Sequence, residues 1–120
     1  MQEFGREERV GSEIHRELAL LLRDEVRDPR LSRVTIQEVR VARDLSHGKV
    51  FFTLMDAAQA KQTEAALNKA ASFLRRRLAE TMNLRTVPRL AFVYDKSVEA
   101  GMRLSSLIDR AVAEDEGHGD

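Results

Sequence analysis

The stretch that decides the fold is residues 34–55, which read VTIQEVRVARDLSHGKVFFTLM. It holds two runs rich in β-branched and aromatic residues, 34–43 and 49–55, and this composition is typical of β-strands. The segment between them, 44–48, has the composition of a turn. Each run is long enough to need a hydrogen-bonded partner, so we predict that the two runs form a β-hairpin.

The apolar positions of this hairpin indicate which side faces the core. Val34 and Ile36 are in one phase of the strand alternation, and Val39 and Val41 are in the other. A β-bulge near residues 37–38, or a strand that begins later than Val34, accounts for the slip. In the second strand the side chains expected to face the core are Val50, Phe52 and Leu54. The side chains expected on the opposite side are Lys49, Phe51 and Thr53, together with Arg40.

An amphipathic helix is predicted before the hairpin, over residues 6–27. Its apolar residues follow one stripe at helical spacing, with charged residues on the other faces. This stripe consists of Val10, Ile14, Leu18, Leu21, Leu22 and Val26. Because the residue before a proline is disfavoured in the helical region, we expect Asp28-Pro29 to end the helix.

Helical periodicity returns after the hairpin, over residues 59–83, with one apolar stripe of Leu67, Ala71, Leu74, Leu78 and Met82. Phe73 lies about 120° off this stripe at about 100° per residue, and the Ser72 hydroxyl can bend a helix by bonding to an earlier carbonyl. A break near residues 70–72 would let Phe73 pack inward. One long helix and two shorter helices therefore both remain open.

The last elements predicted are a third strand, 90–94, and a final helix with Ser97 as its N-cap. The strand is apolar on both faces, so we expect it to be central in the sheet. The order is α-β-β-α-α-β-α, which indicates an α+β domain with helices on one face of a small sheet. We expect one domain over residues 1–113 and an acidic, disordered tail over 114–120.

Charge is distributed unevenly along the chain, although the net charge is zero. Residues 1–29 hold five Arg against eight Asp or Glu, residues 30–103 hold fourteen Lys or Arg against seven, and the remainder holds one against five. A phosphate responds to the local field within a Debye length of about 8–10 Å, so the basic middle favours a nucleic-acid partner.

Catalytic and metal-binding patterns are missing from the sequence. There is no cysteine, no Gly-rich phosphate loop and no supported Ser-His-Asp grouping, and His15, His47 and His118 are dispersed. Asp44 and Asp95 lie in predicted turns, where carboxylates usually cap backbone amides. We therefore predict no enzyme, catalytic residue, metal or cofactor. No apolar run approaches membrane-spanning length, so a cytoplasmic protein is expected.

Basic residues of the second helical region form the strongest candidate site. Lys69, Ser72 and Arg76 share one helix face, with Arg75 and Arg77 beside it. Only Glu80 is near enough in sequence to neutralise the three arginines, and Arg suits phosphate contact and base stacking. The full predicted RNA-binding set adds Arg85 and Arg89 of the next loop, and Arg40, Arg43 and Lys49 of the hairpin.

Two alternatives accompany this hypothesis. The basic residues also fit an ordinary solvated helix face, in which long Arg stems cover apolar neighbours. Phe73 can stack on a base, but core packing after a helix break is favoured for it, and Phe51 is a weaker candidate for stacking.

Several segments resemble the bacterial ribosome-binding factor A family, whose fold is a type II KH-like domain. In order, they are Glu3-Phe4-Gly5-Arg6, Arg9-Val10, Asp28-Pro29-Arg30-Leu31, Arg43-Asp44-Leu45, Lys49-Val50, Leu84-Arg85, Val87-Pro88-Arg89-Leu90, Phe92-Val93-Tyr94-Asp95-Lys96-Ser97 and Gly101-Met102-Arg103. Each segment is short, but their order and spacing cover nearly the whole chain.

The resemblance implies a cytoplasmic assembly factor that binds the small ribosomal subunit and assists late maturation of its rRNA, including 5′-end processing and growth in the cold. In the family an Ala-x-Gly helix break replaces the KH loop GxxG. The matching positions here are Ala70, Ala71 and Ser72, so serine stands where the family has glycine, which leaves the sharpness of the kink open.

The resemblance also implies displacement with help from a GTPase, and a monomer is the expected state. Two other functions remain open on the sequence. One is a KH-like module for another RNA, such as transfer or messenger RNA. The other is a protein-interaction module whose basic face docks on ribosomal proteins.

Overall fold

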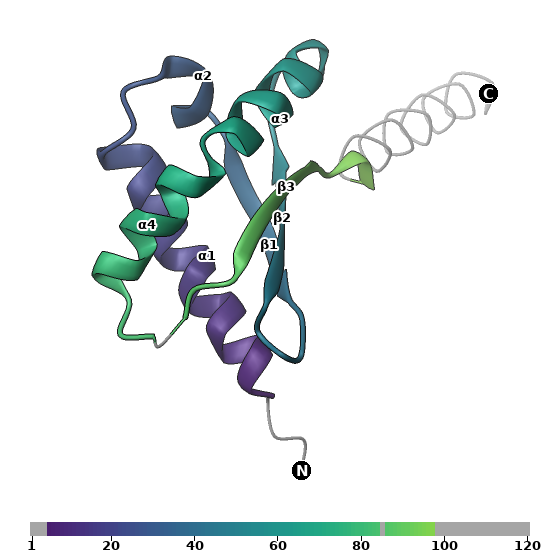
Figure 1. The fold of residues 1–120 in the computed structure, drawn as a ribbon. Coiled ribbons are helices and arrows are strands. Elements are labelled where there is room, and N and C mark those ends of the chain that lie inside the picture. The colour runs from purple at the N-terminus through teal and green to yellow at the C-terminus, as the bar shows by residue number, and fades with distance from the viewer. Residues whose placement is uncertain (1–4, 85, 98–120) are drawn as a thin grey trace, which may run out of the picture.

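The predicted hairpin forms the centre of the structure, a computed structural model that describes residues 5–84 and 86–97 (Figure 1). Strand β1 spans Thr35–Val41 and pairs antiparallel with β2, His47–Thr53. The register shifts between Ile36 and Glu38, so the predicted β-bulge is confirmed. Val50 and Phe52 are fully buried, Leu54 is half-buried, and Lys49 is exposed, as the alternation predicts.

Strand β3, Arg89–Tyr94, pairs parallel with β2, so the sheet order is β1-β2-β3. The prediction that this strand is central was wrong, because it lies at the sheet edge. The physical reason is that helix side chains satisfy its outward backbone groups. Asn68 Oδ1 accepts from Phe92 N at 2.8 Å, Asn68 Nδ2 donates to Phe92 O at 3.0 Å, and Glu64 Oε2 accepts from Tyr94 N at 2.8 Å.

The opposite edge, on β1, is covered by helix α1, Arg6–Asp24. His15 Nε2 lies 2.9 Å from Ile36 O, so this histidine reaches the bulge and is half-buried. Gly11 allows the helix backbone to approach the strand, since a Cβ there would lie 2.8 Å from Val39 O. Both edges of the sheet are thus in contact with helices, which leaves few backbone groups for pairing with another strand.

The chain between the first helix and the sheet differs from the prediction. Helix α1 ends at Asp24 rather than Arg27, and a short helix, α2, follows over Pro29–Ser32. Asp28 caps this helix by accepting from Arg30 N at 3.0 Å. Proline is favourable in a first helical turn because its missing N–H has no partner there in any case. Pro29 therefore begins a helix and does not simply follow the end of one.

The second helical region consists of two helices, α3 over Ala60–Lys69 and α4 over Ala71–Thr81, after a 3-10 turn, η1, over Ala57–Gln59. The break is at Ala70, which has φ −86° and ψ −2°. Any L-residue can adopt this conformation, so the break needs no glycine. Ser72 lies within the first turn of α4.

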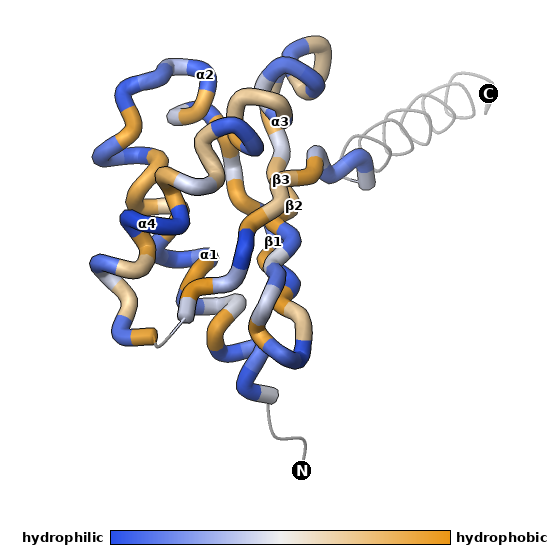
Figure 2. Tube along the Cα trace, in the orientation of Figure 1, coloured by the Kyte–Doolittle hydropathy of each residue, from blue (hydrophilic) through white to orange (hydrophobic). Residues whose placement is uncertain are grey.

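Helices α1, α3 and α4 cover one face of the sheet, and hydrophobic segments of helices and strands meet between them (Figures 1 and 2). The Phe52 and Tyr94 rings pack edge to face, with centroids 5.7 Å apart. The fully buried side chains at the centre of this core are Ile14, Leu18, Val50, Phe52, Leu67 and Leu74. The α+β, type II KH-like class predicted from the sequence is confirmed.

The predictions for the C-terminal region fall largely outside the described residues. These are the final helix, the acidic tail of residues 114–120 and the domain boundary at residue 113. At the start of this region, Lys96 and Ser97 already have helical backbone. Asp95 accepts from Ser97 N at 2.9 Å, so Asp95, not Ser97, occupies the capping position.

Candidate nucleic-acid interface

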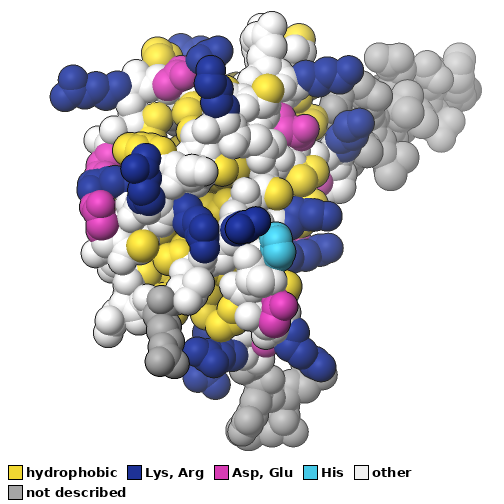
Figure 3. Space-filling view, in the orientation of Figure 1, with side chains coloured by type: hydrophobic (Ala, Val, Ile, Leu, Met, Phe, Trp, Pro, Cys, Tyr) yellow, Lys and Arg dark blue, Asp and Glu magenta, His cyan; other side chains and the backbone are white. Residues whose placement is uncertain are grey.

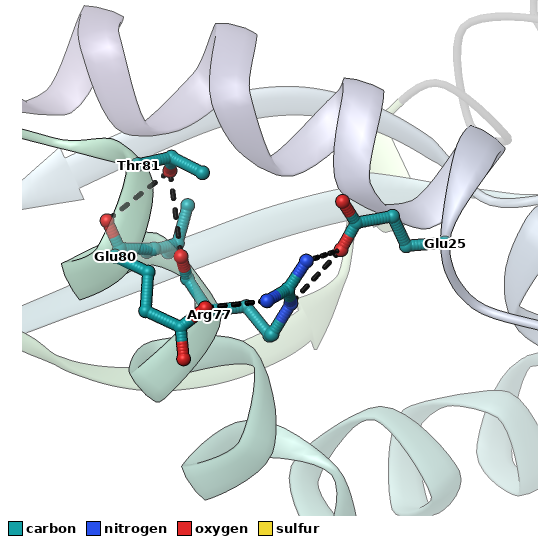
Figure 4. A network of polar contacts seen from close by, with 5 residues as sticks. Glu25, Arg77, Glu80 and Thr81 are labelled. Carbon is teal, nitrogen blue, oxygen red and sulfur yellow. Dashed lines mark hydrogen bonds and ion pairs between the residues drawn. The ribbon is translucent and has the colours of Figure 1, made fainter.

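The three consecutive arginines of α4 have three different environments. Arg77 lies against the C-terminal end of α1, where Nε donates to Glu25 Oε2 at 2.9 Å (Figure 4). Its terminal amino groups pair with Glu25 and Glu80. The Glu25 hydrogen bond, followed by electrostatic attraction to that carboxylate, raises the pKa of Arg77. Arg77 therefore connects two helices, and the expectation that its charge is unneutralised was wrong.

Arg75 points toward the loop that precedes β3. Its Nε donates to Val87 O at 2.8 Å, and the side chain is half-buried. This bond holds the loop against α4 at Val87, which lies two residues before Arg89. Its terminal amino groups make no hydrogen bond to any residue within 5–84 or 86–97. Arg75 thus combines a positioning contact with charge that is available at the surface.

Lys69, Ser72 and Arg76 are exposed on the outer side of the helix pair. Neither cation forms an ion pair with another described residue. Phe73 lies on the same side and is 44% exposed, so the expectation that it packs inward was wrong. Leu74 and Leu78 take the buried stripe of α4, and a residue adjacent to Leu74 is rotated by about 100° from it.

Basic side chains continue from α4 onto the sheet. The Arg75–Val87 bond brings α4 to the start of β3, where Arg89 is exposed and lies opposite His47 of β2. Figure 3 shows Lys and Arg side chains spread over α4 and β3, with a histidine among them. Lys49 comes two residues after His47, and its register partners are Arg40 on β1 and Ala91 on β3. Four elements therefore contribute to one basic band.

The remaining predicted site residues differ in their surroundings. Arg43 is exposed in the hairpin turn, and no ion pair links it to a described residue. Arg40 pairs with Glu38 at 2.9 Å. Arg85 lies outside the described residues. The sequence prediction missed His47 as a member of the band, although alternation from Lys49 places it on the same side of β2.

The two turn carboxylates, Asp44 and Asp95, accept hydrogen bonds from nearby backbone N–H and hydroxyl groups. Asp44 accepts from the hydroxyl and N–H of Ser46, and Asp95 does the same with Ser97. In both cases the hydroxyl bond is the main cause that lowers the aspartate pKa. Within residues 5–84 and 86–97, no three His, Cys, Asp or Glu side chains are grouped closely enough to hold a metal ion. No helix in those ranges has the length and apolar character to cross a membrane.

This architecture defines the class of protein as an α+β, KH-like domain with a basic band across its helix pair and sheet. The chain belongs to the ribosome-binding factor A family, whose family model matches residues 6–108.

Sequence relatives support this assignment over nearly the full length. The chain is 52% identical over 123 residues to ribosome-binding factor A of Stutzerimonas stutzeri, covering 99% of this chain and 95% of the relative. It is 54% identical over 115 residues to the Thioalkalivibrio sulfidiphilus protein of that name, covering 95% and 89%.

Solved structures agree. The crystal structure of ribosome-binding factor A from Thermus thermophilus is 27% identical with a TM-score of 0.66, covering 76% of this chain and 97% of that one. A homology model of the Thermus thermophilus factor, fitted into a cryo-EM map of a 30S–RbfA complex, is 29% identical with a TM-score of 0.59 and covers 72% and 91%.

Proposed function

We propose that this protein is a non-catalytic cytoplasmic factor that associates with the small ribosomal subunit and assists late maturation of its rRNA, including 5′-end processing and growth in the cold. The family assignment and the 30S complex of the Thermus thermophilus relative support this proposal. The observation that carries it for this chain is the pair of exposed cations Lys69 and Arg76 beside Phe73, which form no ion pair with another described residue and are continuous with Arg89 and the sheet.

The helix junction suggests how RNA is held. A KH domain with GxxG uses that loop to clamp the backbone of a single strand. Here α3 and α4 are separated by Ala70 alone, so no such loop is present between them. Side-chain cations therefore have to supply the phosphate contacts. Contacts of this kind position RNA and recognise its shape, and they carry little base-sequence information.

The test reverses Lys69 and Arg76, the two cations of this surface that pair with no residue in the described part of the chain. The Lys69→Glu/Arg76→Glu variant is expected to lose about tenfold or more in affinity for purified small subunits, and the salt slope should fall by about two. Arg77 is left unchanged, because reversing it would place a third carboxylate beside Glu25 and Glu80. Native circular dichroism and an unchanged Tm are required for the comparison.

The matched control is Arg9→Glu/Arg16→Glu, which changes the net charge equally. Both residues are exposed on α1, on the side opposite its buried stripe. This control should keep most of the subunit affinity. Equal losses in the two double variants would show that bulk charge, and not the α3–α4 surface, governs binding.

A second comparison separates the proposed partner from the two other functions. Binding is measured to intact small subunits, naked small-subunit rRNA and an unrelated RNA. Tight binding only to subunits or their precursors supports the assembly factor. Equal binding to all RNAs supports a general KH-like RNA module, and binding to isolated small-subunit proteins supports the protein-interaction module. A GTPase-assisted release, and participation as a monomer, remain part of the proposal.

A further inference from the structure

The outer face of the sheet, opposite the helices, has an ordered arrangement of charged and aromatic side chains. The strand register places Arg40, Lys49 and Ala91 in one row, and Glu38, Phe51 and Val93 in the next. On the other side of the first row, His47 lies opposite Arg89. Helices α1, α3 and α4 all lie on the opposite face. Among the described residues, Phe51 is the only phenylalanine or tyrosine on this outer face, because Phe52, Phe92 and Tyr94 alternate to the inner side.

Arg40 and Phe51 form a stacked pair on this face. The Arg40 guanidinium carbon lies 5.2 Å from the centroid of the Phe51 ring. Arg40 Nε donates to Glu38 Oε1 at 2.9 Å, while the Arg40 side chain remains 68% exposed. Glu38 thus fixes a flat cation above the ring and leaves much of it open to solvent. Holding a flexible arginine in place before binding reduces the entropy lost when a ligand stacks on it.

Charge around this pair is arranged asymmetrically. Lys49 is one strand away from Arg40, at a spacing of about 4.8 Å, and Arg89 lies beyond it on β3. The acidic groups that act on Arg40 are Glu38 and Asp95, which are located toward the Phe51 row and the end of β3. A phosphate is therefore favoured on the Lys49 and Arg89 side, next to a surface on which a base can stack.

We propose that this outer face, where the basic band reaches the sheet, takes an unpaired nucleotide with its base stacked on the Arg40–Phe51 pair and its phosphates beside Lys49 and Arg89. Guanidinium planes and aromatic rings are the groups on which splayed-out RNA bases stack. A paired base in a continuous duplex has no free face for this contact. The inference rests on the proposed function for its RNA partner, but it uses residues distinct from Lys69 and Arg76.

The experiment measures binding of the full chain to a short oligoadenylate and to an abasic strand of the same length. Wild type is expected to prefer oligoadenylate. Arg40→Lys keeps the charge but removes the flat guanidinium, and Phe51→Leu keeps apolar volume but removes the ring. Each variant should lose roughly five- to a hundredfold in oligoadenylate affinity, with little change toward the abasic strand. The salt slope of Arg40→Lys should remain that of wild type, which a loss of phosphate contacts would not produce.

Arg33→Lys is the matched control, because Arg33 is an exposed arginine just before β1 that lies outside the predicted RNA-binding set and is not stacked on a ring among the described residues. It should retain the wild-type preference. If Phe51→Leu unfolds, the exposed Arg40→Lys variant still decides the question. The proposal is overturned if wild type shows no preference for bases, or if both variants keep it.

The two surfaces can fail separately. Loss of base preference in Arg40→Lys, with normal subunit binding in Lys69→Glu/Arg76→Glu, would uphold the sheet surface and reject the helix surface. Normal base preference in Arg40→Lys, with impaired subunit binding in the α3–α4 variant, would give the opposite result.

Discussion

The inner and outer sides of the α3–α4 pair use similar residues for different purposes. On the inner side, Asn68 pairs with the backbone of β3, and Arg77 pairs with Glu25, the residue that follows α1. On the outer side, Lys69, Phe73 and Arg76 are exposed. Adjacent residues therefore stabilise the fold or remain available for RNA according to the direction in which the helix presents them. The comparison shows that a run of arginines cannot be treated as one site.

The largest expected effect contrasts two neighbours on α4. Leu74→Ala should reduce the free energy of unfolding by about 2–5 kcal/mol, because Leu74 is fully buried. Phe73→Ala should cost less than about 1 kcal/mol, as expected at a partly exposed position, while it weakens subunit binding. Urea denaturation and subunit co-sedimentation measure the two effects. Equal destabilisation by both changes would mean that Phe73 packs in the core after all.

The next effect concerns the edge strand. Asn68→Ala leaves the N–H and C=O of Phe92 without their side-chain partner, and we expect a loss of about 1–2 kcal/mol in the free energy of unfolding. The same change at Asn83, which is exposed and whose side chain makes no hydrogen bond to another described residue, provides the control. Hydrogen exchange at the Phe92 amide should also become faster. An unchanged exchange rate would contradict the conclusion that the Asn68 side chain protects the Phe92 N–H by hydrogen bonding.

A smaller effect separates Arg77 from Arg76. Arg77→Met keeps the aliphatic length but removes the bonds to Glu25 and Glu80, so its Tm should fall by less than that of Asn68→Ala. Arg76→Met should keep the wild-type Tm and lose subunit affinity instead. High salt should reduce the Tm difference between the two variants, because exposed ion pairs are screened. The reverse pattern would exchange the roles assigned to these two residues.

The smallest effect is expected at the helix break. Ser72→Gly should change the free energy of unfolding by no more than about 0.5 kcal/mol, because Ser72 is in the first turn of α4 and the break is at Ala70. The circular dichroism spectrum should keep its helical signal. A clear change in helicity would show that residue 72 controls the kink.

Local patterns in the sequence predicted much of the fold. The alternation of Val50 and Phe52, the phase slip near Gln37, and the two-helix option near Ala70 all depend on neighbours within a few residues. These features therefore follow from strand and helix periodicity alone. Helical spacing likewise predicted one shared face for Lys69 and Arg76, and both are exposed in the structure, whereas their role in RNA binding stays a prediction.

What the sequence by itself determined is thus the order and amphipathic faces of the elements, together with the family. Only the tertiary structure decided which polar side chains form hydrogen bonds to distant parts of the fold. Arg77 meets Glu25 across 52 residues, Asn68 meets Phe92 across 24, and Arg75 meets Val87 across 12. Such partners come together only when the helices pack on the sheet, and no local period encodes them. The same packing makes β3 an edge strand, exposes Phe73, and brings α4 and the three strands into one basic band.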